Sequence, residues 1–198
     1  LENCGTSVRT RAKAAAAAGS DARMNGCAMP VVINSGSGNQ GMTVSLPVVE
    51  YAKELGVSHE KLLRSLCVAN LVAIHQKTDI GRLSAFCGAV SAATGAVAGI
   101  AYMEGASYEV IAQTIVNSIA NVGGMVCDGA KSSCAGKIAS ALESAFLGYE
   151  LAKESRGFYD GEGIVKADVE ATIASVGRMA SAGMLGTDKE ILNIMVGR

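Results

Sequence analysis

Tryptophan is absent from this sequence of 198 residues, and only three phenylalanines and five tyrosines supply aromatic rings. So few rings leave little surface for stacking against nucleic-acid bases. An excess of positive charge is missing as well, because 17 lysines and arginines are balanced by 18 aspartates and glutamates. A nucleic-acid partner requires a basic patch, and we therefore expect none.

Proline and histidine are also scarce, with two residues each. Glycine (24 residues) and alanine are abundant, hydrophobic residues make up 49% of the chain, and the mean hydropathy is +0.31. These values exclude an intrinsically disordered chain, and abundant alanine without β-branched alternation favours helices. Val31-Val32-Ile33 is the only β-like triplet. We therefore predict an all-α fold, one compact multi-helix domain over residues 1–198.

One stretch, Leu83–Met103, carries no charge and is long enough to span a bilayer. Most of it is alanine, glycine, serine and threonine, which contribute little to membrane insertion. We therefore predict a buried central helix over about residues 83–104, apolar all round because other helices surround it. The protein is expected to be cytoplasmic, with no membrane partner, since its start also lacks a signal-peptide profile.

Capping residues and glycines delimit the other predicted helices. The first is predicted to end at Gly19-Ser20-Asp21, the second to open at Ser45 and Pro47, and the last to begin with a capping box at Thr187. The predicted ranges are 2–18, 45–55, 59–77, 107–121, 134–155, 168–182 and 187–196.

Six cysteines occur without any CxxC pair, which argues against a disulfide framework. Cys4, Cys27 and Cys67 are predicted to be small buried hydrophobic residues. The other three, Cys87, Cys127 and Cys134, lie beside glycines, polar residues and predicted helix starts, which favour the thiolate. Three converging thiolates without a nearby histidine suit an iron–sulfur cluster better than zinc.

The segment SGSGNQG (residues 35–41) contains three glycines among hydroxyl and amide side chains. It is neither a GxGxxG fingerprint nor a Walker A loop, because it lacks GK[ST] and no long strand precedes it. Free backbone amides at a helix entrance would bind a small anion such as a carboxylate. A tight interhelical turn with no ligand explains the same residues, and the sequence leaves both interpretations open.

Four segments together resemble a known family. They are NGC (residues 25–27), SGSGNQG (35–41), IGRLSAFCG (80–88) and MVCDGAKSSCA (125–135). In their order and cysteine spacing they look like the L-cysteine desulfidase family, which is related to the alpha chain of bacterial iron–sulfur L-serine dehydratases. The resemblance covers almost the whole chain and the C-terminal part of a typical member. Because the chain also opens on Leu1, we expect it to be cut from a longer catalytic chain.

The resemblance implies a set of site residues. Cys87, Cys127 and Cys134 would hold a [4Fe–4S] cluster through three of its irons and leave the fourth open. Lys131 would contact the ammonium or carboxylate of a small amino-acid substrate, unless it is simply a solvated lysine. The carboxylate would lie on the glycine loop, formed by Ser35, Gly36, Ser37, Gly38, Asn39 and Gln40.

The implied reaction is α,β-elimination, which converts L-cysteine to sulfide, pyruvate and ammonia. Elimination of water from L-serine is the alternative within the same class, and a non-catalytic helical interaction or regulatory module is the second alternative. The catalytic base is expected in the missing N-terminal segment, so the isolated chain is expected to be inactive. Apolar surface left by that segment would also favour self-association into a homo-oligomer.

Overall fold

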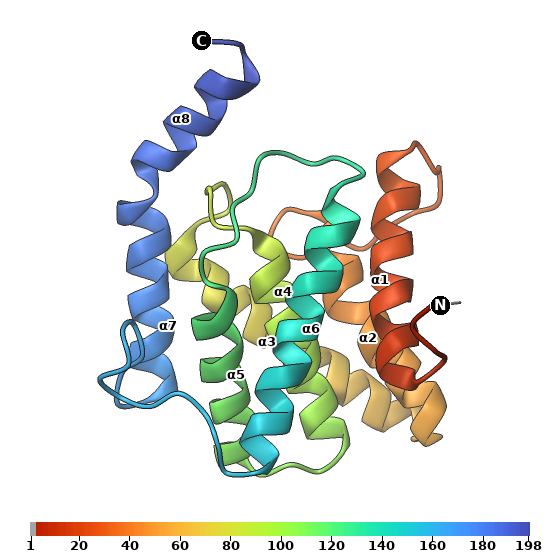
Figure 1. Ribbon diagram of the computed structural model, residues 1–198. Coiled ribbons are helices and arrows are strands. Elements are labelled where there is room, and N and C mark those ends of the chain that lie inside the picture. The colour runs from red at the N-terminus through yellow and green to blue at the C-terminus, as the bar shows by residue number, and fades with distance from the viewer. Residues whose placement is uncertain (1–2) are drawn as a thin grey trace.

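Helices form almost all of the regular structure in the computed structural model, which describes residues 3–198 (Figure 1). Within that range the only paired extended backbone consists of two isolated bridges, Asn34 with Ser37 and Phe86 with Val126. The predicted all-α fold is therefore confirmed. The helices are α1 (Val8–Met24), α2 (Gly38–Leu55), α3 (His59–Ile80), α4 (Gly88–Met103), α5 (Tyr108–Val122), α6 (Cys134–Lys153), α7 (Val169–Arg178) and α8 (Leu185–Met195).

Helix α4 lies at the centre, packed against α2, α3, α5 and α6. Every residue of α4 except Tyr102 is buried, so the predicted central helix is confirmed and its apolar composition follows from its surroundings. It begins at Gly88 rather than near Leu83, whose side chain is 97% exposed. Among the described residues no helix has both the length and the hydropathy that crossing a bilayer would demand.

Two glycines of α4 allow α3 to pack very closely. A Cβ atom on Gly95 would lie 2.4 Å from the carbonyl oxygen of Ala69, and one on Gly99 would lie 2.6 Å from that of Ser65. Real Cβ atoms do not approach backbone oxygens so closely, so both positions exclude any larger residue unless the helices separate. The GxxxG spacing of this apolar run thus serves helix packing inside the protein.

Several predicted boundaries are wrong at the N-terminal side. Helix α1 continues through Gly19-Ser20-Asp21 to Met24, because Gly19 lies against Met42 and Leu46 of α2 and Ser20 is buried. The start predicted at Glu2 lies outside the described residues. Helix α2 begins at Gly38 rather than Ser45, since the Ser37 side chain accepts the Gln40 amide, and Pro47 lies inside the helix.

The C-terminal helices also differ from the prediction. Helix α7 ends at Arg178 and is followed by one π-helical turn over Met179–Gly183. Helix α8 starts at Leu185 with Met184 as its N-cap, so Thr187 does not cap it. No residue of α8 is buried, and the helix extends beyond the bundle in Figure 1. The remaining predicted helices agree with α3, α5 and α6 to within three residues.

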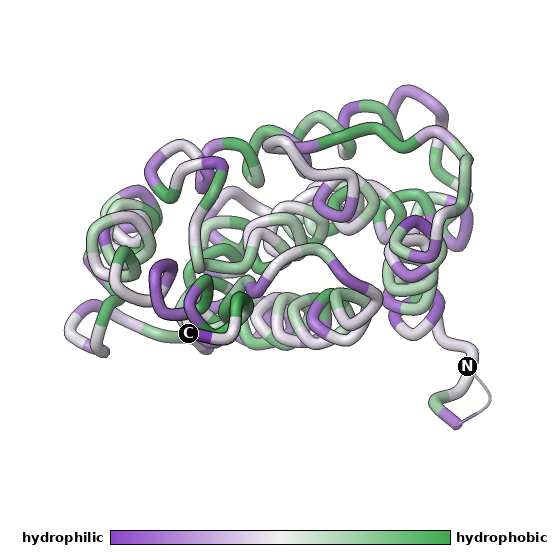
Figure 2. The backbone as a smooth tube through the Cα atoms, turned by 90° about the horizontal axis from the view of Figure 1, so that it is seen from above, coloured by the Kyte–Doolittle hydropathy of each residue, from purple (hydrophilic) through white to green (hydrophobic). Residues whose placement is uncertain are grey.

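Helices α2, α4 and α6 all begin at the same end of the bundle, the upper end in Figure 1. Figure 2 looks onto this end and shows hydrophilic and hydrophobic segments alternating along the helices around it. Since each helix N-terminus presents free amides and a partial positive charge, this end favours negatively charged groups.

Replacement of Gly95 by alanine should destabilise the protein, because the added methyl group meets the backbone of α3. Overpacking of this kind costs about 1–3 kcal/mol, measurable as a lower free energy of unfolding in urea. Gly136→Ala, at an exposed position of α6 with no atom within 4 Å of its Cβ position, is the matched control and should be neutral or stabilising. Equal losses in both variants would contradict the packing role of Gly95.

Candidate functional site

A short antiparallel pairing joins the loop before α4 to the loop before α6. The Cys87 amide donates to the carbonyl oxygen of Met125 at 3.0 Å, and the Cys127 amide donates to that of Ala85 at 2.6 Å. Phe86 and Val126 form the bridge between these bonds. Two cysteines that are 40 positions apart in the sequence are thereby fixed next to each other, close enough for each thiol to shift the pKa of the other.

Cys134 completes the group as the first residue of α6. Its sulfur accepts the Lys131 amide at 3.5 Å, and its thiol donates to the carbonyl oxygen of Gly129 at 3.7 Å. Cys87, Cys127 and Cys134 all line one cavity of about 80 Å³. The structure therefore brings together the three cysteines that were proposed from the sequence as cluster ligands.

The other three cysteines are exposed, so the prediction that Cys4, Cys27 and Cys67 are buried is wrong. Cys67 lies on the outward face of α3, because Ser65, Ala69 and Ala73 form the inward face. The cysteines proposed as ligands are instead the less exposed set, since Cys87 is buried and Cys127 and Cys134 are half buried.

The glycine loop is a tight turn that also caps a helix. Asn34 and Ser37 exchange backbone hydrogen bonds of 3.1 and 3.0 Å, and the two residues between them have positive φ angles, 50° at Ser35 and 85° at Gly36. This is the pattern of a type I′ turn. The Asn34 side chain donates to Asn70 of α3 at 2.9 Å, which fixes the turn on the bundle.

The loop residues divide between two cavities. Ser37, Asn39 and Gln40 line the cysteine cavity, whereas Ser35 and Gly36 line a neighbouring cavity of about 490 Å³. Gly38 lines neither one.

Arg23 of α1 and Gln40 of α2 pack around the start of α2, and Gln40 also lines the cysteine cavity. The Arg23 guanidinium occupies the space where a Gly38 side chain would lie and donates to Asn39 Oδ1 at 3.1 Å. The Gln40 side chain fills the space that a Cβ on Gly88 would take. Gln40 Oε1 is buried and receives no hydrogen bond from the residues that the structure describes.

Lys137, which no sequence motif indicated, is the cation of the cysteine cavity. It lies one turn after Cys134 on α6, donates to the carbonyl oxygen of Val126 at 3.1 Å and forms an ion pair with Asp128. The signal that could have found it is this i, i+3 spacing, which places both side chains on one helix face. Lys131, the lysine proposed from the sequence, forms an ion pair with Asp128 at 3.2 Å and does not line the cavity.

The environment separates the acidities of the two paired thiols. The Cys87 hydrogen bond, the Gly129 amide and the charge of Lys137 lower the pKa of Cys127, against the effect of burial. The hydrogen bond to Cys127 and burial raise the pKa of Cys87. Hydrogen bonds from Lys137 and Lys131 lower the pKa of Asp128 to about 2. The first proton is therefore lost from Cys127, and Asp128 stays ionised beside it.

The donor set fits an iron–sulfur cluster better than a single metal ion. Within residues 3–198 no three histidine, cysteine, aspartate or glutamate side chains lie close enough together to hold one ion. A four-iron cluster is larger than an ion and takes thiolates from around a cavity. Three thiols around one cavity, beside three helix N-termini and Lys137, provide the ligand type and the positive field that such a cluster needs.

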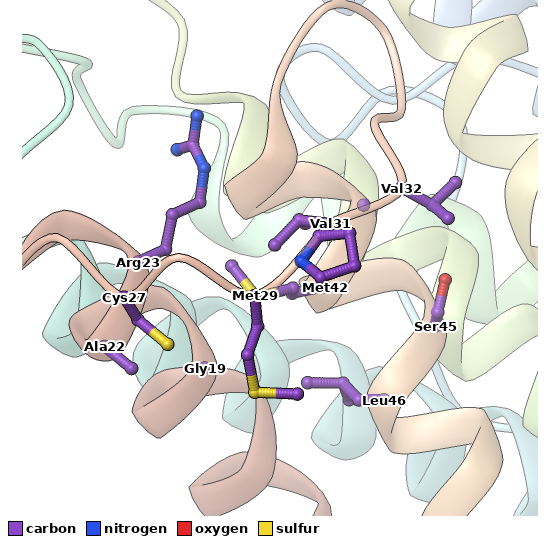
Figure 3. A pocket seen from close by; sticks show the side chains of 12 residues that line it. Gly19, Ala22, Arg23, Cys27, Met29, Val31, Val32, Met42, Ser45 and Leu46 are labelled. Carbon is purple, nitrogen blue, oxygen red and sulfur yellow. The ribbon is translucent and has the colours of Figure 1, made fainter.

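A larger pocket of about 350 Å³ lies between α1, α2 and the segment 27–32 (Figure 3). Its lining is mostly apolar, and in this view the Met29 side chain lies between those of Cys27 and Leu46. Its one cation, Arg23, already binds Asn39. The pocket therefore lacks the converging polar groups of the cysteine cavity.

A family model described as serine dehydratase alpha chain matches residues 2–193. A UPF0597 protein of Desulfitobacterium hafniense is 60% identical over 99% of this chain and 46% of its own length. UPF0597 proteins of Lachnoclostridium phytofermentans (59% identical, 99% of this chain, 47% of that protein) and Treponema denticola (57%, 96% and 44%) are similar. This chain thus spans just under half the length of these curated relatives, and their names state no activity. No solved structure matches it.

Alkylation of Cys127 should begin at lower pH in the folded chain than in the unfolded one, because its pKa is lowered only by folded-state contacts. In urea the thiol should react with a midpoint near its ordinary pKa of about 8.5. Mass spectrometry after iodoacetamide pulses at several pH values measures both midpoints. Lys137→Met should move the folded midpoint upward, and identical midpoints in folded and unfolded protein would contradict the assignment.

Proposed function

The chain belongs to the serine dehydratase alpha-chain family, and on this premise we propose that it forms the cluster-binding part of a carbon–sulfur lyase. The reaction would be α,β-elimination of L-cysteine to sulfide, pyruvate and ammonia. One observation carries the proposal. A single cavity is lined by three thiols of suitable chemistry and by the polar residues of the glycine loop.

Cys87, Cys127 and Cys134 would hold a [4Fe–4S] cluster. When bound, the cluster supplies a Lewis-acidic iron that accepts negative charge developing on the leaving group. The chain's own residues favour the thiolate of Cys127 and partly oppose the burial that raises the pKa of Cys87. The Ala89 amide at the start of α4 and the Gly129 amide donate to Cys87 and Cys127, and Lys137 adds a positive charge next to both. Asp128 keeps Lys137 in place.

The glycine loop would bind the substrate carboxylate. As the first two residues of α2, Gly38 and Asn39 have amides without intrahelical acceptors, and such amides favour anions. Arg23 fixes the Asn39 side chain, and Ser37 already uses its hydroxyl group to cap the helix. Donors at this position also stabilise the charge that spreads onto the carboxylate when the Cα proton leaves.

The proton acceptor for Cα would come from outside this chain, either from the remaining half of a protein of the relatives' length or from a companion chain. Elimination of water from L-serine is the second candidate, because the matching family is described by that activity. The two reactions share the carboxylate contacts and the Cα proton transfer. They differ only in the group that leaves from the β carbon.

Anaerobic reconstitution with iron and sulfide should load the chain with a cluster. We expect broad visible absorption and close to four irons per chain, as a [4Fe–4S] centre requires. Cys87→Ser, Cys127→Ser and Cys134→Ser should each lose most of the iron. Cys67→Ser is the matched control, since Cys67 is exposed on the outside of α3, and it should load like wild type. A colourless wild-type product would contradict the proposal.

Substrate choice is tested by product analysis on the full-length Desulfitobacterium hafniense relative after reconstitution. We expect sulfide and pyruvate from L-cysteine and little pyruvate from L-serine. The opposite preference would assign the dehydratase reaction. The 198-residue chain alone should load iron but release no sulfide, because the proposed base is absent from it.

A further inference from the structure

A second lysine, Lys77 near the end of α3, is buried without a partner. Only 5% of its surface is exposed, and its ammonium forms no hydrogen bond or ion pair with any residue from 3 to 198. Its position continues the inward stripe of α3 after Ser65, Ala69 and Ala73. Lys77 Nζ is not among the fully buried polar atoms, so the stem of the side chain is buried while the ammonium reaches accessible space. A partly desolvated ammonium without a counter-charge is costly, so proteins normally pair such groups. Lys137, by contrast, has Asp128.

Lys77 lies in the wall of the neighbouring cavity of about 490 Å³. It is the only buried residue of that lining, and the others are half buried or exposed, so the cavity opens to solvent around it. The lining includes no carboxylate, and it places Lys77 with Ser35 and Gly36 of the glycine loop and with exposed Arg82. This wall therefore carries two cations and no carboxylate, alongside the apolar side chains of Ile33 and Ile74.

The turn supplies two further donors at this cavity. Asn34 and Ser37 bond to each other through their backbones, and the amides of Ser35 and Gly36 between them form no backbone hydrogen bond. Both residues have positive φ angles, and consecutive amides in such a turn form a concave anion site. Ser37, which closes the same turn, lines the cysteine cavity, so the two cavities adjoin, and Lys77 lies within electrostatic reach of Cys127 and Cys87.

We infer that the cavity between the Ser35–Gly36 turn and the end of α3 binds the carboxylate of a small amino acid or 2-oxo acid, with the Lys77 ammonium as its counter-ion. This inference rests on the proposed function for the identity of the acid. It moves the carboxylate along the glycine loop from the Gly38 and Asn39 amides to the Ser35–Gly36 turn, and it assigns to Lys77 the role that the sequence suggested for Lys131. Burial lowers the pKa of Lys77, so the ammonium is stabilised most when an anion is bound.

Thermal unfolding of the chain without iron, titrated with sodium pyruvate, tests the inference. Binding to the folded state raises the melting temperature in proportion to occupancy, so wild type should show a saturating rise. Lys77→Met keeps the length of the side chain and removes its charge. Without ligand, this variant should have a melting temperature no lower than that of wild type, because it loses an unpaired charge at a largely buried position. With pyruvate, its melting temperature should either stay constant or need about tenfold more pyruvate to rise by the same amount.

Lys189→Met is the matched control, because Lys189 is exposed on α8 and forms no ion pair or hydrogen bond with the described residues. It should respond to pyruvate like wild type. Lys77→Arg keeps the charge and should retain part of the response, which distinguishes loss of the counter-ion from a folding defect in Lys77→Met.

Three results would overturn the inference. The first is a wild-type melting temperature that does not change with pyruvate. The second is a Lys77→Met variant whose melting temperature rises with pyruvate as that of wild type does. The third is a rise of the wild-type melting temperature with inorganic phosphate that equals the rise with pyruvate at the same concentration. The second result would indicate Arg82 instead of Lys77 as the counter-ion of the carboxylate. The third would mean that the cavity recognises negative charge and not the carboxylic acid. The pyruvate titration uses protein without iron, and the iron-loading experiment uses protein with an unchanged Lys77. A failure of one experiment is therefore distinguishable from a failure of the other.

Discussion

The pairing of residues 85–87 with 125–127 is the constraint on which the site depends. Backbone bonds from Cys87 to Met125 and from Cys127 to Ala85 join two loops that precede different helices. Phe86, 1% exposed, anchors the pairing in the interior, and Lys137 ties it to α6 through the Val126 carbonyl oxygen. Without this pairing, α4 and α6 could still pack, but nothing would hold the Cys87 and Cys127 thiols in contact.

Electrostatics at this end of the bundle follows from helix direction. Because α2, α4 and α6 all start here (Figure 1), their N-terminal amides surround the thiols. Two lysines reinforce this positive field in different ways. Lys137 is neutralised by Asp128 and so serves the thiolates without attracting another anion strongly. Lys77 has no such partner among the described residues, which leaves its charge available to a ligand.

Local patterns in the sequence were sufficient for the fold class and the buried α4, and they singled out Cys87, Cys127 and Cys134, which the structure places around one cavity. They failed where tertiary contacts outweigh local preference. Gly19 stays helical because Met42 and Leu46 pack on it, and Pro47 lies within α2 because Ser37 caps that helix earlier. Lys77 and Lys137 were missed because a lysine within a helix is usually solvated. Only the packing of α3 and α6 shows that both face the interior cavities.

The division of the glycine loop between two cavities bears on which substrates the proposed lyase would accept. One tight turn, fixed by the Asn34–Ser37 pair and by Asn70, holds Ser35 and Gly36 at one cavity and leads into Asn39 and Gln40 at the other. The separation of the two cavities is therefore set by a rigid element. A carboxylate held at Lys77 and a leaving group held among the thiols must span that separation. A leaving group on the γ carbon of an amino acid lies one bond farther from the carboxylate than a leaving group on the β carbon. A rigid spacing therefore selects the position of the leaving group, whether that group is sulfur or oxygen.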